Sequence, residues 1–174
     1  MPHNLLLTGR PGIGKTTVIR RLLALLPPLQ ASGFTTAEVR AAHGRLGFLA
    51  ATLAGHEILL AHVQRRSPYR VGAYGVDVAA FEREIVPALS AERGEVELFV
   101  VDEIGKMECF SPAFRAAVER LLEDPRPLLG TIALRGTPFI EQVRARPDVQ
   151  LIEVTAANRD SLPQQLARRV QEWL

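Results

Sequence analysis

The amino-acid sequence predicts a three-layer α/β fold with a mostly parallel central sheet and an antiparallel hairpin or edge extension. Short apolar runs alternate along the chain with segments whose apolar residues recur at helical spacing. This alternation is typical of a parallel sheet that is covered by helices on both faces. The chain has 174 residues, of which 47% are hydrophobic and 23% charged. This length and composition suit one domain that spans residues 1–174.

The first third of the chain predicts a strand, a glycine loop, a helix and a hairpin. A strand is predicted over 4–8, and a helix over 17–26 ends at two prolines. The segments 33–39 and 46–53 are rich in Phe, Thr, Val and Leu, and polar and glycine residues separate them. This favours an antiparallel hairpin or edge strands. The segment 57–70 lacks clear periodicity, so we expect a mobile loop there that covers a site.

The rest of the chain continues the alternation of helices and strands. Asp77 is expected to cap a helix that runs to about residue 92 and is shortened or kinked by a proline. The apolar run 98–101 is typical of a buried parallel strand, and Ser111 with Pro112 begins a helix. The remaining predicted elements are a strand over 128–132, a helix over 138–146, a strand over 149–154 and a last helix that ends at 174.

The segment GRPGIGKTT, from Gly9 to Thr17, matches the phosphate-loop pattern G-x-x-x-x-G-K-S/T between a predicted strand and a predicted helix. Its glycines let backbone N–H groups point at phosphate oxygens, and the helix directs its positive end to the same anion. We expect Lys15 to bridge the β- and γ-phosphates, Thr16 to bind Mg²⁺ and Thr17 to support an α-phosphate contact. The predicted nucleotide-binding residues of this loop are Gly9, Arg10, Pro11, Gly12, Ile13, Gly14, Lys15, Thr16 and Thr17.

Two carboxylates follow the apolar run LFVV at the end of a predicted strand. Ligands of open parallel sheets bind at this edge, so Asp102 is expected to bind Mg²⁺ together with Thr16. Glu103 could orient and deprotonate a water molecule that attacks the γ-phosphate, which favours hydrolysis over transfer to a second substrate. The alternative is that both acids belong to a solvated strand end.

Six segments together resemble the thermophilic NTPase family of small nucleoside-triphosphatases. The motif DEIGKME, residues 102–108, is the most specific of them, and the resemblance covers nearly the whole chain. It implies a RecA-like P-loop NTPase domain that uses Mg²⁺ to hydrolyse ATP, GTP, CTP, UTP and related nucleotides to the diphosphate and phosphate. The six segments are GRPGIGKTT, GFTTAEVR, RVGAYGVDVAAFE, VVDEIGKMECF, LLGTI and VTAANRDSLP.

The resemblance also extends to residues outside the phosphate loop. Lys106 could place positive charge near the γ-phosphate, or it could form a surface ion pair. Thr131 could sense the γ-phosphate, or it is an ordinary threonine at a strand end. Asn158 could hydrogen-bond to the base and Arg159 could stack on it, or Asn158 or Asp160 caps the last helix. The predicted catalytic residues are Lys15, Glu103 and Lys106.

Composition narrows the expected partners and location. The net charge is +2 and the arginines are scattered along the chain, so nucleic acid is not an expected partner. The apolar runs are too short to cross a bilayer. Cys109 has no partner cysteine and the N-terminus has no secretory pattern, so we expect a cytoplasmic protein. The single domain predicts a monomer.

Two other functions fit the same phosphate loop. A small nucleotide or metabolite kinase would transfer the γ-phosphate to an acceptor molecule. A nucleotide-dependent switch would turn over slowly and act through a partner. The pair Asp102 and Glu103 favours the hydrolase over the kinase.

Overall fold

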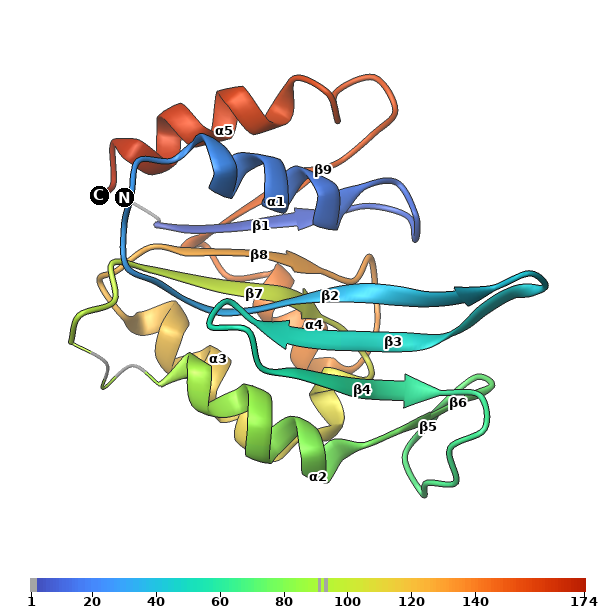
Figure 1. Ribbon diagram of the computed structural model, residues 1–174. Coiled ribbons are helices and arrows are strands. Elements are labelled where there is room, and N and C mark those ends of the chain that lie inside the picture. The colour runs from blue at the N-terminus through green and yellow to red at the C-terminus, as the bar shows by residue number, and fades with distance from the viewer. Residues whose placement is uncertain (1–2, 91, 93) are drawn as a thin grey trace.

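The computed structural model describes residues 3–90, 92 and 94–174. Nine strands form one sheet in the order β5-β6-β4-β3-β2-β7-β8-β1-β9 (Figure 1). The strands are β1 (Asn4–Thr8), β2 (Ala31–Ala41), β3 (Gly44–Thr52), β4 (Glu57–His62), β5 (Arg70–Val71), β6 (Tyr74–Val76), β7 (Leu98–Ile104), β8 (Leu128–Ile132) and β9 (Val149–Glu153).

Helices cover the sheet on both faces. Figure 1 shows α1 and α5 together on one face, with α2, α3 and α4 on the other. This arrangement confirms the predicted three-layer α/β fold. The helices are α1 (Lys15–Leu25), α2 (Val78–Ala80), α3 (Pro112–Glu123), α4 (Pro138–Arg144) and α5 (Leu162–Gln171), with a π-helix η1 (Phe81–Ile85) and 3₁₀-helices η2 (Val86–Leu89) and η3 (Glu108–Phe110).

The sheet has a parallel half and an antiparallel half. Neighbouring strands among β2, β7, β8, β1 and β9 are parallel, with β8 between β1 and β7. The strands β3, β4, β6 and β5 continue the sheet beyond β2 in antiparallel pairs. The carboxyl ends of β1, β7 and β8 therefore meet at one edge, where open α/β sheets bind their ligands.

The side-chain alternation of a strand explains how one sheet supports two cores. Leu5 and Leu7 of β1 pack on the side of α1 and α5, whereas Leu6 packs on the side of α3 and α4. On that second side Phe34 contacts Phe81 and Phe114 edge-on, with ring centroids 5.6 and 6.2 Å apart. These buried rings join β2 to the π-helix η1 and to α3.

Most predicted elements lie within a few residues of their expected positions. The hairpin is formed by β2 and β3, and Ser111 accepts a hydrogen bond from the backbone N–H of Phe114 at the start of α3. The predicted mobile loop over 57–70 is wrong in its first part. Residues 57–62 form β4, which pairs with β3 and β6, so neighbouring strands stabilise a segment without clear periodicity of its own.

The helix predicted after Asp77 begins as expected but does not continue as one α-helix. Asp77 caps α2 by accepting a hydrogen bond from Ala80 N–H. The chain then widens into the π-helix η1 and tightens into the 3₁₀-helix η2, which contains Pro87 and ends before an extended Ser90. Ala91, which the predicted helix would include, lies outside the described residues. Pro87 lacks an N–H donor, which accounts for the break.

In the part of the chain that the structure describes, none of the helices has the length and apolar character needed to cross a membrane.

Replacing Phe114 with alanine should lower the free energy of unfolding by about 3–5 kcal/mol, because it leaves a cavity between β2 and α3. Urea unfolding followed by circular dichroism measures this change. Leu53→Ala is the control, since Leu53 is 38% exposed and its replacement should cost much less. An equal loss of unfolding free energy in the two variants would contradict the inference that the packed rings of Phe34, Phe81 and Phe114 stabilise the fold.

Candidate active site

A glycine-rich loop connects β1 to α1 at the carboxyl edge of the parallel strands (Figure 1). Gly14 immediately precedes α1 and has a φ angle of 113°, a left-handed conformation that glycine adopts readily. The side chain of Ile13 is buried in the core beneath α1 and anchors the loop. The first N–H groups of α1, which have no partner within the helix, are left at the open side of the loop.

The ammonium group of Lys15 is held against the loop by backbone carbonyls. Its Nζ donates to the carbonyl oxygens of Gly9, at 3.0 Å, and Arg10, at 3.3 Å. A positive charge and the positive end of α1 therefore converge on one point, which favours an anion there.

The buried carboxylate of Asp102 connects the phosphate-loop helix to two strands. Its Oδ1 accepts hydrogen bonds from Thr16 Oγ1, at 3.1 Å, and from Thr131 Oγ1, at 2.7 Å. Its Oδ2 accepts a longer bond from the N–H of Thr36, at 3.4 Å. Burial raises the pKa of Asp102, and the hydrogen bonds from Thr131 and Thr16 oppose that rise. Thr131 is fully buried near the end of β8 and supports Asp102 through this hydrogen bond, whereas sensing of the γ-phosphate by Thr131 stays a prediction.

The hydroxyl of Thr16 and the carboxylate of Asp102 fit a Mg²⁺ ion. Both are oxygen ligands, and Mg²⁺ in phosphate sites takes only one or two protein ligands alongside phosphate oxygens and water. Among residues 3–90, 92 and 94–174, no group of three or more His, Cys, Asp or Glu side chains could hold a metal by itself.

Two further carboxyl groups lie beside the turn that follows β7. Gly105 lies close to both carboxyl groups: a Cβ atom placed on it would be 3.0 Å from Glu108 Oε2 and 3.4 Å from Glu103 Cδ. The turn at Gly105 therefore brings both groups to the same place. Burial raises the pKa of Glu103, and the charge on Lys15 counteracts this effect. Burial and then the charge on Glu103 raise the pKa of Glu108 well above its ordinary value.

Lys106 is an exposed cation next to these acids. In the part of the chain that the structure describes, its ammonium forms no ion pair or hydrogen bond. Its stem passes near Gly136 in the segment after β8, where a Cβ on that glycine would be 3.6 Å from Lys106 Cγ. The surface ion pair considered for Lys106 is therefore not found, and its charge faces the cavity.

A cavity of about 940 Å³ brings most of the predicted residues together. It begins at the phosphate loop, passes the carboxyl end of β7 and extends along β2 and β3. The predicted residues that line it are Gly9, Pro11, Gly12, Gly14, Lys15, Thr16, Thr17, Asp102, Glu103 and Lys106. The predicted residues that do not line it are Arg10, Ile13, Asn158 and Arg159.

Asn158 and Arg159 follow β9, which lies on the opposite side of β1 from β8 and β7. The amide of Asn158 accepts a hydrogen bond from Thr155 N–H, at 2.8 Å, and donates one to the carbonyl of Glu153, at 2.9 Å. Both the oxygen and the nitrogen of this amide therefore form hydrogen bonds within the turn after β9. The hydrogen bond to a base that is predicted for Asn158 would have to replace one of them. Arg159 donates to the carbonyl of Ile13 at 3.3 Å and is exposed.

The family model described as NTPase matches residues 4–167. The chain belongs to this family. The nucleoside-triphosphatase THEP1 of Thermotoga maritima is 43% identical over 158 residues, which cover 91% of this chain and 90% of the relative. The cancer-related nucleoside-triphosphatase of Homo sapiens is 39% identical, with 93% of each chain covered. The crystal structure of THEP1 from Aquifex aeolicus has a TM-score of 0.88 and 34% identity, covering 97% and 99% of the two chains.

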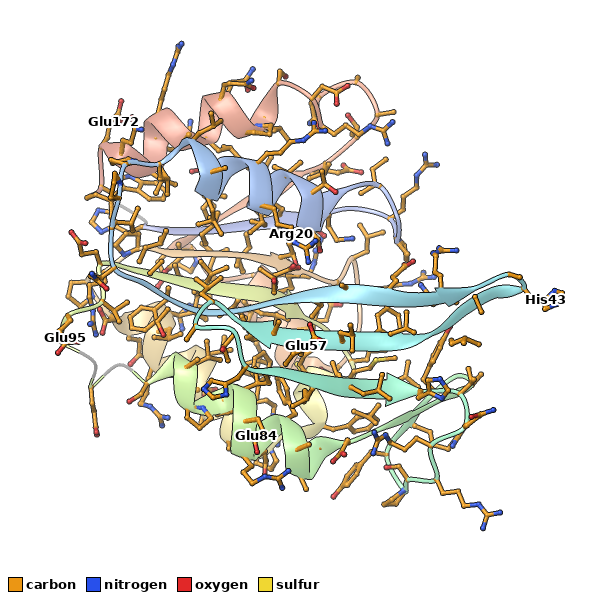
Figure 2. All side chains as sticks on the ribbon, in the orientation of Figure 1. Arg20, His43, Glu57, Glu84, Glu95 and Glu172 are labelled. Carbon is orange, nitrogen blue, oxygen red and sulfur yellow. The ribbon has the colours of Figure 1, made fainter. Side chains whose placement is uncertain are left out.

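This member of the NTPase family has site residues that our sequence interpretation missed. Arg20 lines the cavity and donates to the carbonyl of Thr36 at 3.2 Å, and Figure 2 shows it between α1 and β2. It lies one helical turn after Thr16, so i, i+4 spacing could have identified it. Glu108 was visible in the DEIGKME motif, but only the turn at Gly105 reveals its proximity to Glu103.

Glu108→Gln should stabilise the protein relative to wild type as the pH rises from 4 to 8. The folded protein keeps a proton on Glu108 that the unfolded chain releases, because the pKa of this carboxyl is raised on folding. The stability that depends on this proton is complete below the pKa of the unfolded chain and is lost as the pH rises through the higher folded pKa. Glutamine keeps the shape and has no proton to lose.

Urea midpoints at several pH values, in buffer without divalent cations, measure this effect. The control is Glu172→Gln, because Glu172 is exposed at the end of α5 (Figure 2). A difference between Glu108→Gln and wild type that stays constant with pH would contradict the assignment of a protonated Glu108.

Proposed function

We propose that the protein hydrolyses nucleoside triphosphates, including ATP, GTP, CTP and UTP, to the diphosphate and phosphate, and that it requires Mg²⁺. The observation that carries this proposal is the one cavity in which the phosphate loop, Asp102 and Glu103 meet. The names of the relatives, nucleoside-triphosphatases in bacteria and in man, support the same activity. We also propose that residues 1–174 act as one domain, as a monomer and in the cytoplasm.

The phosphate loop would bind the triphosphate through its backbone N–H groups and the start of α1. Lys15 already lies over the loop, and it would exchange its bonds to the carbonyls of Gly9 and Arg10 for bonds to the β- and γ-phosphates. The side chain of Ile13 stays in the core, so this residue contributes only its backbone.

Thr16 and Asp102 would hold the Mg²⁺ ion. The hydrogen bond from Thr16 to Asp102 brings the two oxygen ligands together, and Thr131 fixes the orientation of the carboxylate. When bound, the ion neutralises negative charge on the phosphate oxygens.

Glu103 would orient a water molecule and accept its proton as the water attacks the γ-phosphate. The bond from the γ-phosphorus to the bridging oxygen breaks, and the diphosphate leaves on the opposite side. Burial of Glu103 favours its protonated form, so this carboxylate is a stronger base than one in water. Lys106, which has no ion-pair partner among the described residues, would stabilise the charge that develops on the γ-phosphate oxygens.

Arg159 would stack on the base through its exposed guanidinium, next to the phosphate loop. Stacking of this kind accepts any base, which agrees with the proposed range of substrates.

Replacing Glu103 with glutamine should lower kcat for phosphate release roughly 10²- to 10⁴-fold, because the general base is lost, while nucleotide binding persists. Phosphate release from ATP, GTP, CTP and UTP with Mg²⁺ is measured beside nucleotide affinity. Lys15→Ala is the comparison, since it should weaken binding and hydrolysis together. Unchanged turnover in Glu103→Gln would remove Glu103 from the reaction.

Lys106→Gln should lower kcat roughly 10²-fold with a smaller change in KM, since its charge is needed mainly in the transition state. Lys106→Arg keeps the positive charge and should recover part of the rate. Steady-state kinetics with ATP measure both variants. A rise in KM at constant kcat would assign Lys106 to substrate binding instead.

A further inference from the structure

The large cavity extends well beyond the phosphate loop. Its far part, which we call the distal chamber, is lined by Glu38, Arg40, Arg45, Phe48, Tyr74 and Arg135. These residues come from the β2–β3 hairpin, from the start of β6 and from the segment after β8. Figure 1 shows the hairpin projecting past the ends of β1, β7 and β8, and His43 marks its tip in Figure 2. The antiparallel part of the sheet thus forms one wall of the cavity, and this wall is not needed for binding a phosphate at the phosphate loop.

The distal chamber carries an excess of positive charge. Arg40 and Arg45 both bond to the carboxylate of Glu38, at 2.7 and 3.1 Å, so two cations share one acid. Arg135 and Lys106 also line the cavity. Burial and the charge on Glu103 raise the pKa of Glu108 well above its ordinary value, which favours the neutral form of this carboxyl. Such a surface favours an anionic ligand.

The same chamber has an ordered aromatic wall. Arg45 donates to the hydroxyl of Tyr74 at 2.9 Å, and its guanidinium lies 4.8 Å from the ring centroid of Phe48. The rings of Phe48 and Tyr74 meet edge-on with centroids 5.3 Å apart. Leu60 and Met107 add apolar surface. Apolar and aromatic walls with a few fixed polar groups are typical of sites for small organic ligands.

A triphosphate on the phosphate loop would leave the distal chamber open. This step rests on the proposed function, in which Arg159 stacks on the base. Arg159 follows β9, which pairs with β1 on the side away from β7, whereas the chamber residues Phe48 and Tyr74 belong to β3 and β6, beyond β7 on the other side of β1. A base stacked on Arg159 would therefore lie on the opposite side of the phosphate loop from the distal chamber. The γ-phosphate would then face the chamber across Glu103 and Lys106.

We propose that the distal chamber is a second binding site, which takes a small phosphorylated molecule with a planar ring while the triphosphate occupies the phosphate loop. Nucleoside monophosphates have this chemistry. The phosphate of such a molecule contacts the arginines of the chamber, and its ring packs against the wall formed by Phe48 and Tyr74.

Equilibrium dialysis tests this site with radiolabelled AMP, GMP, CMP and UMP. The protein is first saturated with Mg²⁺ and adenylyl imidodiphosphate, an ATP analogue that is not hydrolysed. We expect at least one monophosphate to bind with one molecule per chain while the analogue remains bound. Displacement of every bound monophosphate by the analogue, or no binding of any of the four, would overturn the proposal.

Two substitutions locate the bound monophosphate. Arg40→Gln and Arg135→Gln should each weaken its binding about tenfold, because each removes a charged donor. Glu38 keeps Arg45 as a partner in the first variant. The matched control is Arg83→Gln, since Arg83 bonds to Glu84 at 2.9 Å in η1 and does not line the cavity. Unchanged affinity in both chamber variants, or an equal loss in the control, would overturn the location.

The second site and the proposed hydrolysis can fail separately. Phosphate release is measured without any monophosphate, whereas the dialysis uses an analogue that cannot be hydrolysed. A protein that binds both ligands but releases no phosphate would refute the hydrolase and leave the second site standing. A protein that hydrolyses ATP but binds no monophosphate would refute the second site and leave the proposed hydrolysis standing.

Discussion

The buried carboxylate of Asp102 is the interaction on which the arrangement of the site depends. A carboxylate with 1% exposure is strongly destabilising unless hydrogen bonds replace water, and three different elements supply those bonds. Thr16 comes from α1, Thr131 from β8 and Thr36 from β2. The requirement to satisfy one acid therefore fixes the phosphate-loop helix relative to β7 and to the strands on both sides of it.

The topology of the sheet makes this convergence possible. Strand β8 separates β1 from β7, so its residue Thr131 lies between the phosphate loop and the acidic strand end. Close strand contacts maintain the spacing: a Cβ on Gly33 of β2 would be 1.9 Å from the carbonyl oxygen of Val100, and one on Gly130 of β8 would be 2.3 Å from that of Val101. The parallel half thus holds the chemistry, while the antiparallel half extends the cavity.

Local sequence patterns predicted the α/β fold, the phosphate loop and the acidic strand. Each of these patterns, such as a strand followed by its glycine loop, lies within a short stretch of the sequence. The structure places the predicted residues Lys15, Asp102 and Glu103 along one cavity. Features that depend on distant partners were missed. Strand β4, for example, forms because β3 and β6 pair with it. The amide of Asn158 bonds to groups only three and five residues away, but the orientation of those groups is set by the folded turn and not by the spacing of residues in the sequence.

The charges around the cavity explain how acids and phosphates can share one site. Asp102, Glu103 and Glu108 would repel a triphosphate if all three were fully ionised and unpaired. Burial and the negative charge on Glu103 raise the pKa of Glu108 well above its ordinary value, which favours the neutral form of this acid. Lys106, which forms no ion pair with any described residue, adds a positive charge to the same cavity. The raised pKa of Glu108 therefore reduces the negative charge at the end of this strand, and Lys15 and Lys106 supply the positive charge that favours an anion there.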